Sequence, residues 1–200
     1  MNKRIILLSC LCLVALCICC SAKDDTSSQL STLVAYSETN DSNVNMTLFS
    51  PVLAFGLPDM GTAVKFTAPY PSWRLQRILI YAWSGYNEST QTFPTDRNIM
   101  IEVRDKDHTL LYKFADSQNN YFLSDAGPVF GLIEIPDIKL TGDFYVIYYD
   151  RLAAPIGALE VNDSGNSYLF QNDTLIPAKF NMSDTNETLS YNWMIEVAGK

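Results

Sequence analysis

The stretch WRLQRILIYAW, residues 73–83, decides the fold class. Read as an extended strand, it places Leu75, Leu79, Tyr81 and Trp83 on one face, with Arg77 among them, and Ile78, Ile80 and Ala82 on the other. A strand that is apolar on both faces is buried on both faces. The stretch therefore predicts a strand inside a β-domain.

Two further stretches extend this prediction. In IMIEVRDKDHTLLYKF, residues 99–114, alternation predicts a half-buried strand, a turn at 105–108 and a second strand, which together form a hairpin. In GLIEIPDIKLTGDFYVIYYD, residues 131–150, a strand over 132–135 is expected to be interrupted at Pro136-Asp137, and a buried central strand is expected over 144–149.

Shorter strand candidates complete the pattern, and no segment has a convincing helical periodicity. They lie at residues 44–49, 63–66, 157–161, 168–170 and 193–197. Nine or ten short strands separated by turn signals predict an all-β fold, an antiparallel β-sandwich spanning residues 44–200. Residues 23–43 are rich in Ser, Thr, Asp and Asn, which predicts a flexible tether.

All five cysteines lie within residues 10–20, in a segment with a basic start, a short apolar core and small residues at its end. This order predicts a signal peptide over residues 1–22 and hence export. Two processing routes stay open: cleavage after Ala22, or lipidation at Cys20 (less directly Cys19), which would anchor the chain to the membrane. Cleavage after Ala22 would leave a domain without cysteines and therefore without disulfides.

The charge balance is acidic. The chain has 14 basic and 22 acidic residues, a net charge of −8. Loss of Lys3 and Arg4 with the leader leaves 12 against 22, a net charge of −10. Because phosphate binding requires clustered Lys and Arg, nucleic acid is not expected as a partner.

Glycosylation sequons, Asn-x-Ser/Thr, are enriched. They make up half of the 14 asparagines: Asn40, Asn45, Asn87, Asn162, Asn172, Asn181 and Asn186. In an exported chain such sequons are acceptors for N-linked glycans. The alternative is that Asn, Ser and Thr merely share turns. Asn45 is the weakest candidate because it falls in a predicted strand.

The segments GTAVKFTAPYPSWRLQRILIYAW, IEIPDIKLTGDFYVIYYD and NWMIEVAG, in this order, resemble a sandwich domain common in methanogen surface proteins. The resemblance covers roughly residues 43–199 and implies a jelly-roll-like exported archaeal domain of uncharacterised function. Two positions depart from that pattern: Ala68 replaces a usual proline, and Glu196 replaces a usual basic residue.

Catalytic and metal signals are weak. His108 is the only histidine and falls in a predicted turn, where we expect it to be solvated, so a serine triad has no base. Six acidic residues could pair as in glycoside hydrolases, but no spacing singles them out: Glu102, Glu134, Asp143, Asp150, Glu160 and Glu196. Calcium would require oxygen ligands in loops, and no recognised spacing is present. The sequence predicts a protein that is not an enzyme and has no cofactor or metal.

Aromatic residues at strand ends provide the candidate ligand contacts, which are Trp83, Tyr86 and Tyr121. Exposed rings beside polar groups can stack on sugars, although rim packing is the more common role. Trp193, Tyr145 and Tyr148 instead fit core strands. We expect a non-enzymatic, envelope-anchored glycoprotein that acts as a surface binding or interaction module. Carbohydrate recognition and a structural role in the envelope are the alternatives.

Overall fold

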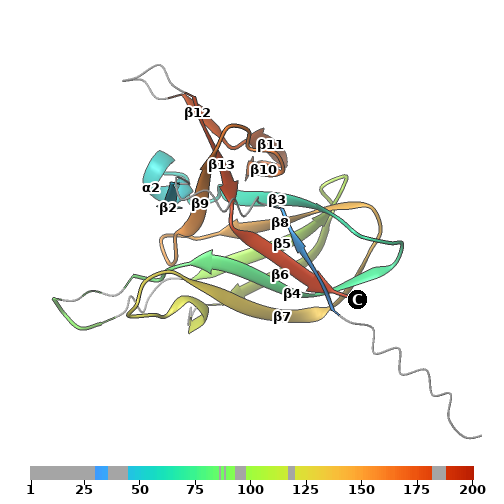
Figure 1. The fold of residues 1–200 in the computed structure, drawn as a ribbon, viewed down its shortest axis with the longest axis horizontal. Coiled ribbons are helices and arrows are strands. Elements are labelled where there is room, and N and C mark those ends of the chain that lie inside the picture. The colour runs from blue at the N-terminus through green and yellow to red at the C-terminus, as the bar shows by residue number, and fades with distance from the viewer. Residues whose placement is uncertain are drawn as a thin grey trace, which may run out of the picture.

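The protein is a sandwich of two antiparallel β-sheets, seen in a computed structural model that describes residues 30–35, 45–85, 87, 89–92, 98–116, 120–181 and 188–200 (Figure 1). The prediction of an all-β antiparallel sandwich is confirmed. The predicted signal peptide and Cys20 lie outside the described residues. Among the described residues, no helix is long and apolar enough to cross a membrane.

Sheet A has eight strands. Its order is β1 (Ser31–Val34), β14 (Ile195–Gly199), β4 (Trp73–Ala82), β9 (Ile156–Val161), β13 (Thr188–Trp193) and β12 (Lys179–Asn181), with β7 (Val129–Leu140) paired to β4 and β2 (Met46–Phe49) paired to β9. Sheet B has six strands in the order β11 (Thr174–Pro177), β10 (Ser167–Gln171), β3 (Gly61–Thr67), β8 (Asp143–Tyr149), β5 (Ile99–Asp105) and β6 (Leu110–Asp116). Two short helices are α2 (Pro51–Phe55) and η1 (Asn120–Phe122).

The predicted central strand at residues 73–83 is β4, and a β-bulge changes which residues face the core. In the pairing of β4 with β14, Ala198 lies opposite Arg77 and Gly199 opposite Leu75, so Gln76 is an extra residue in β4. Because a bulge inserts one extra residue, the side chains beyond it turn over relative to those before it. The fully buried side chains are accordingly those of Trp73, Leu75, Ile78, Ile80 and Ala82. Leu75 thus joins the face of Ile78 and Ile80, contrary to strict alternation.

Pro136 interrupts the regular pairing of its strand with β4, where the partners jump from Ile138 to Glu134, but it does not end the strand as predicted. β7 continues through Pro136 from Val129 to Leu140. In the described residues β7 pairs with β4 alone, which makes it an edge strand. Proline is tolerated on an edge strand because no neighbour needs its missing N–H.

The helix α2 was not predicted from the sequence. Ser50 caps its N-terminus by accepting a hydrogen bond from the Leu53 N–H, Pro51 begins the helix, and Gly56 ends it with φ +69°. Ser, then Pro, then Gly five residues later is a local helix signature. One turn is too short to produce a 3.6-residue periodicity, so the apolar pattern does not reveal this helix.

Part of the predicted tether is a strand. Ser31–Val34 forms β1 and pairs antiparallel with β14 at the edge of sheet A. Leu33 packs against the main core, and the Ser31 hydroxyl accepts a hydrogen bond from the indole N–H of the buried Trp73 at 3.1 Å. One apolar side chain and one hydroxyl therefore attach this polar stretch to the sandwich.

Candidate functional site

The surface around α2 carries the most exposed apolar side chains near a concavity. Leu53 is 74% exposed and Phe55 is 43% exposed. Each lines a different apolar pocket. In Figure 1, α2 lies with β2 and β10–β12 on the upper side of the view, away from the C-terminus. We call α2 with its two pockets the α2 surface.

The first pocket of the α2 surface contains Trp83, one of the three predicted ligand contacts. Its volume is about 320 Å³, and its lining residues are Leu48, Leu53, Trp83, Ser84, Gly85, Leu152, Ala153 and Pro155. Trp83 is half-buried and donates its indole N–H to the carbonyl of Ser124 at 2.9 Å. The Ser84 hydroxyl donates to the Phe122 carbonyl at 3.0 Å. With these donors already engaged, the pocket offers mainly apolar surface to a ligand.

The second pocket of the α2 surface lies between α2 and strands β11 and β12. It has a volume of about 280 Å³ and is lined by Phe55, Leu57, Met60, Leu169, Ile176, Pro177, Lys179 and Phe180. Ile176 is 44% exposed at its rim. Among its lining residues, Lys179 carries the only charge, and its ammonium lies 2.9 Å from the Asp163 carboxylate.

An aromatic cluster supports this surface from beneath. It contains Phe49, Phe55, Phe180, Tyr191 and Trp193. The Phe49 and Trp193 ring centroids are 4.9 Å apart, and the Tyr191 and Trp193 rings are nearly parallel at 7° with centroids 6.2 Å apart. Trp193 is fully buried, whereas Phe49, Phe180 and Tyr191 are half-buried. The cluster thus runs from the core to the surface.

Tyr121 and Tyr86 are the other two predicted ligand contacts. Among the described residues, they do not form a common binding surface with Trp83. Tyr121 is half-buried in η1 and packs edge-on against Phe114, with centroids 6.1 Å apart. Burial and the nearby Asp116 carboxylate raise the pKa of its hydroxyl. Tyr86 lies outside the described residues.

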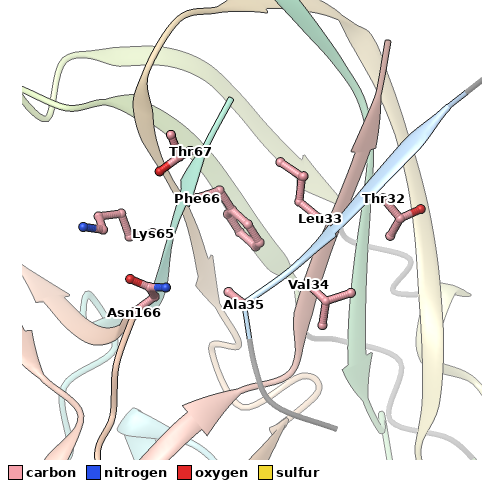
Figure 2. Close-up of a pocket in the computed structure, with 8 residues that line it drawn as sticks. All are labelled: Thr32, Leu33, Val34, Ala35, Lys65, Phe66, Thr67 and Asn166. Atoms are coloured by element: carbon pink, nitrogen blue, oxygen red, sulfur yellow. The ribbon is translucent and has the colours of Figure 1, made fainter. Parts of the chain in front are cut away.

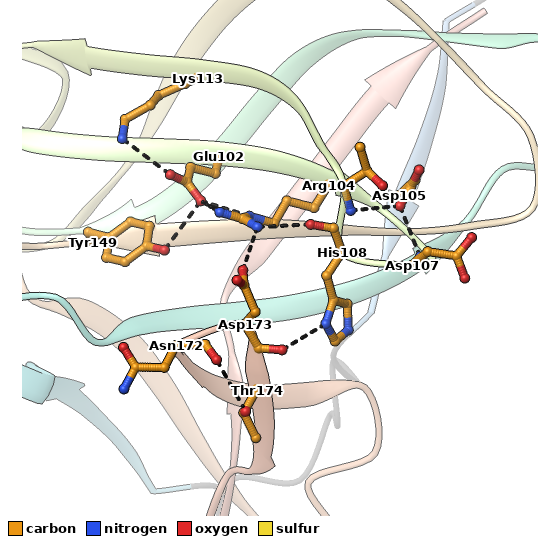
Figure 3. A network of polar contacts seen from close by, with 11 residues as sticks. Glu102, Arg104, Asp105, Asp107, His108, Lys113, Tyr149, Asn172, Asp173 and Thr174 are labelled. Carbon is orange, nitrogen blue, oxygen red and sulfur yellow. Dashed lines mark hydrogen bonds and ion pairs between the residues drawn. The ribbon is translucent and has the colours of Figure 1, made fainter.

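A polar network, absent from the sequence-based predictions, lies on the outer face of sheet B (Figure 3). Glu102 is only 4% exposed, and its Oε2 accepts hydrogen bonds from Arg104 Nε at 2.9 Å and from the Tyr149 hydroxyl at 3.3 Å. Lys113 Nζ lies 3.3 Å from Glu102 Oε1. Arg104 Nη1 also donates to the His108 carbonyl and to the Asp173 carboxylate, both at 2.8 Å. This arrangement ties β5 to the tip of the β10–β11 hairpin.

Tyr145 lies in the central strand β8, where it is half-buried and packs in the smaller hydrophobic cluster on the outer face of sheet B. One prediction about this face is corrected. His108 lies in the expected turn, with φ +63°, but is half-buried rather than simply solvated, its ring 5.3 Å from that of Tyr145. Its Nδ1 lies 3.0 Å from the Asp173 carbonyl. Because a carbonyl oxygen can only accept, this contact requires a proton on Nδ1.

Asp150 is the most deeply buried carboxylate among the described residues, with 1% exposure. Neither oxygen accepts a hydrogen bond of good geometry from any residue that the structure describes. Burial raises its pKa, and the nearby Ser50 hydroxyl and Leu152 N–H oppose this increase without cancelling it. Asp150 is linked to the α2 surface through Ser50, whose side chain also caps α2.

A third concavity lies between the two sheets, where β1 and β3 approach each other. It has a volume of about 370 Å³, and the Phe66 ring lies between the two strands (Figure 2). Thr32, Leu33, Val34, Ala35, Lys65, Phe66, Thr67 and Asn166 line it. The short strand β1 forms one side of this concavity.

Five sequon asparagines fall among the described residues, and all five are exposed: Asn45, Asn87, Asn162, Asn172 and Asn181. Asn40 and Asn186 lie outside the described residues. Asn172 occupies the tip of the β10–β11 hairpin with φ +49°. Asn45, the weakest candidate by sequence, immediately precedes β2.

No group of three or more His, Cys, Asp or Glu side chains that could hold a metal ion occurs in the described part of the chain.

No protein-family model matches this sequence, and no curated protein is significantly similar to it. The resemblance to a methanogen surface domain therefore stays a prediction.

Proposed function

We propose that this chain is an exported, glycosylated surface domain, held at the membrane through its N-terminus, that acts as a non-enzymatic binding module. The observation that carries this proposal is the exposure of every described sequon asparagine. A glycan must extend into solvent, so exposure at all five is the arrangement that glycosylation requires.

The α2 surface is the proposed binding surface. Two apolar pockets flank a single exposed turn of helix, and Leu53 and Phe55 stand between them. Exposed apolar side chains grouped around concave surface are typical of interaction sites. The proposed partner is a surface molecule of the cell envelope with an apolar face.

The proposal that the domain is not an enzyme rests on how its polar side chains are used. The His108 ring contacts a backbone carbonyl, and Glu102 is held between Arg104 and Lys113. Neither lines a pocket of the α2 surface. Covalent catalysis requires at least a nucleophile with an adjacent base. Neither His108 nor Glu102 is placed to supply that base in these pockets.

Carbohydrate recognition is the second candidate, and the position of Trp83 in an apolar pocket favours it. An indole ring presents a flat apolar face to the C–H bonds of a sugar ring. A glycan array probed with the natural chain and with a Trp83→Ala variant would test this. A Trp83-dependent signal supports the candidate, and an array without signal excludes it.

Intact mass spectrometry of the native protein tests the main proposal. We expect loss of residues 1–22 or a lipid on Cys20, together with mass increments for several glycans. A full-length, unmodified chain would contradict it. Detergent extraction and fractionation give the location: recovery with the membrane fraction supports the anchor, and recovery only in the medium contradicts it.

A further inference from the structure

We propose that a glycan on Asn45 folds back onto the protein and packs against Tyr191, with Glu160 accepting hydrogen bonds from its hydroxyls. The inference rests on the proposed glycosylation and goes beyond it by giving one sequon a structural task. It commits to the chain's own glycan as the occupant of this face.

Asn45, Glu160 and Tyr191 form a row across three neighbouring strands. The Glu160 N–H donates to the Asn45 carbonyl at 3.0 Å, and Glu160 is the direct antiparallel partner of Tyr191. Residues directly opposite each other in an antiparallel pair share a face. The Asn45 amide Nδ2 reaches the Glu160 carboxylate at 3.4 Å, so its side chain points along the row.

The row is short enough for a glycan to span. Two strand spacings separate Asn45 from Tyr191, about 10 Å in total. A sugar linked to Asn45 Nδ2 begins beside Glu160 and extends toward the Tyr191 ring. Because it is covalently attached, its local concentration far exceeds that of any free sugar.

The chemistry of the row suits a saccharide. The Tyr191 ring is half-buried and lies against Phe49, Phe180 and Trp193, with the Phe180 centroid 5.7 Å away. These neighbours hold the ring in place, as a stacking platform requires. The Tyr191 hydroxyl is neutral at neutral pH and can donate a hydrogen bond, and burial, together with the Glu160 charge, raises its pKa further. The Glu160 carboxylate is a strong acceptor for sugar hydroxyls.

Attachment preserves this geometry. The Asn45 Nδ2 nitrogen forms a bond to the anomeric carbon of the sugar, loses one proton and displaces the phosphate-linked carrier of an activated glycan donor. One N–H remains on Nδ2 and can still donate to Glu160. The acceptor side chain is exposed, and so is Thr47, the hydroxyl residue of the sequon.

The glycan would stabilise a weak edge. β2 has four residues and, among the described residues, pairs with β9 alone. A glycan bound across β9 and β13 ties β2 to two strands instead of one. Loss of the glycan should therefore lower the thermal midpoint.

The test is a double-substitution cycle on the natural glycoprotein. Thr47→Val removes the sequon and keeps the Asn45 side chain, and Thr47→Ser keeps the sequon. Tyr191→Leu removes the ring, and Tyr191→Phe retains it. Thr174→Val, which removes the distant Asn172 sequon on the β10–β11 hairpin, is the matched control for loss of a glycan. Each chain is examined by intact mass spectrometry and by thermal unfolding.

We expect Thr47→Val to remove one glycan and lower the midpoint by about 2–4 °C, with Thr47→Ser and Thr174→Val close to the natural chain. Tyr191→Leu should cost about 2–4 °C more in the glycosylated chain than in the Thr47→Val background, and Tyr191→Phe should show no such difference. Equal effects in both backgrounds, or dimerisation of the Thr47→Val variant, would overturn the inference. Glycans on other sequons with Asn45 unmodified would overturn it while leaving the proposed function intact, and a chain without glycans would overturn both.

Discussion

Arg104 Nη1 lies 2.8 Å from Asp173 Oδ1, and this contact joins residues 69 positions apart in the sequence. The same guanidinium is held by Glu102 and lies over the Phe170 ring, 4.9 Å from its centroid. β10 pairs with β3 at its base, whereas its hairpin tip reaches β5 through Arg104. Contacts on the outer face of sheet B therefore join strands that are not neighbours in the sheet, and Ala63, Ile147 and Glu102 are buried on that face.

Arg104→Met should destabilise the domain strongly, because it leaves the buried Glu102 carboxylate without its closest cation. We expect a loss of about 3 kcal/mol in the free energy of unfolding, measured by urea denaturation. Asp173→Asn is the matched control, since Asp173 is 75% exposed. It should cost less than about 1 kcal/mol. Equal losses in the two variants would show that the guanidinium acts mainly through the hairpin tip.

Asp150→Asn should change how stability depends on pH. Burial raises the folded-state pKa of Asp150 above 3.8, so its protonated form favours the folded state. That contribution is complete below pH 3.8 and is lost as the pH rises through the folded-state pKa. The asparagine variant should therefore be the more stable chain at neutral pH, by about 1 kcal/mol, and the difference should shrink in acid.

Asp137→Asn is the control with the opposite sign. Hydrogen bonds from Gln76 and Arg74 lower the pKa of Asp137, so its carboxylate stabilises the folded state above pH 3.8. This variant should be less stable than the natural chain at neutral pH, and the difference should disappear in acid. Unfolding free energies of all three chains from pH 3 to 8 test both signs, and parallel pH profiles would contradict the assignment.

The sequence predicts the strands whose apolar alternation is local. β4, the β5–β6 hairpin and the central strand β8 lie where the pattern places them. The bulge in β4 was not predictable in this way, because it appears only in the register against the neighbouring strand β14. A single extra residue moves every side chain beyond it to the opposite face of the sheet, so local alternation placed Leu75 on the wrong face.

The candidate site was less predictable than the fold. Trp83 could be selected because an aromatic residue at a strand end is visible in the sequence. The network around Glu102 depends on Arg104, which also binds Asp173 at a hairpin tip 69 positions further along the chain, and no local pattern encodes that contact. The Ser50, Pro51 and Gly56 signature of α2 is local, so helix-capping rules alone could have found the centre of the α2 surface.

Leu53→Asp should weaken apolar binding at the α2 surface without unfolding the domain. Leu53 is 74% exposed, so the change should alter the free energy of unfolding by no more than about 0.5 kcal/mol. If it contributes about 1.5 kcal/mol of apolar contact, affinity for the dye anilinonaphthalene sulfonate should fall about tenfold. Leu110→Asp on β6 adds the same charge at an exposed leucine outside both pockets and should leave dye binding unchanged. Equal loss in both variants would show that charge, not the α2 surface, governs the binding.

Removal of β1 should destabilise the sandwich. This effect would show that residues 30–35 are part of the fold and not only a tether. A chain that begins at Tyr36 loses the Leu33 contact with the core and exposes the paired edge of β14. It also leaves the indole N–H of Trp73 without the Ser31 hydroxyl. We expect a loss of about 2 kcal/mol in the free energy of unfolding relative to a chain that begins at Leu30, and a red shift of tryptophan fluorescence as Trp73 gains water. Identical unfolding curves for the two chains would mean that β1 contributes nothing to the fold and that residues 30–35 serve only as tether.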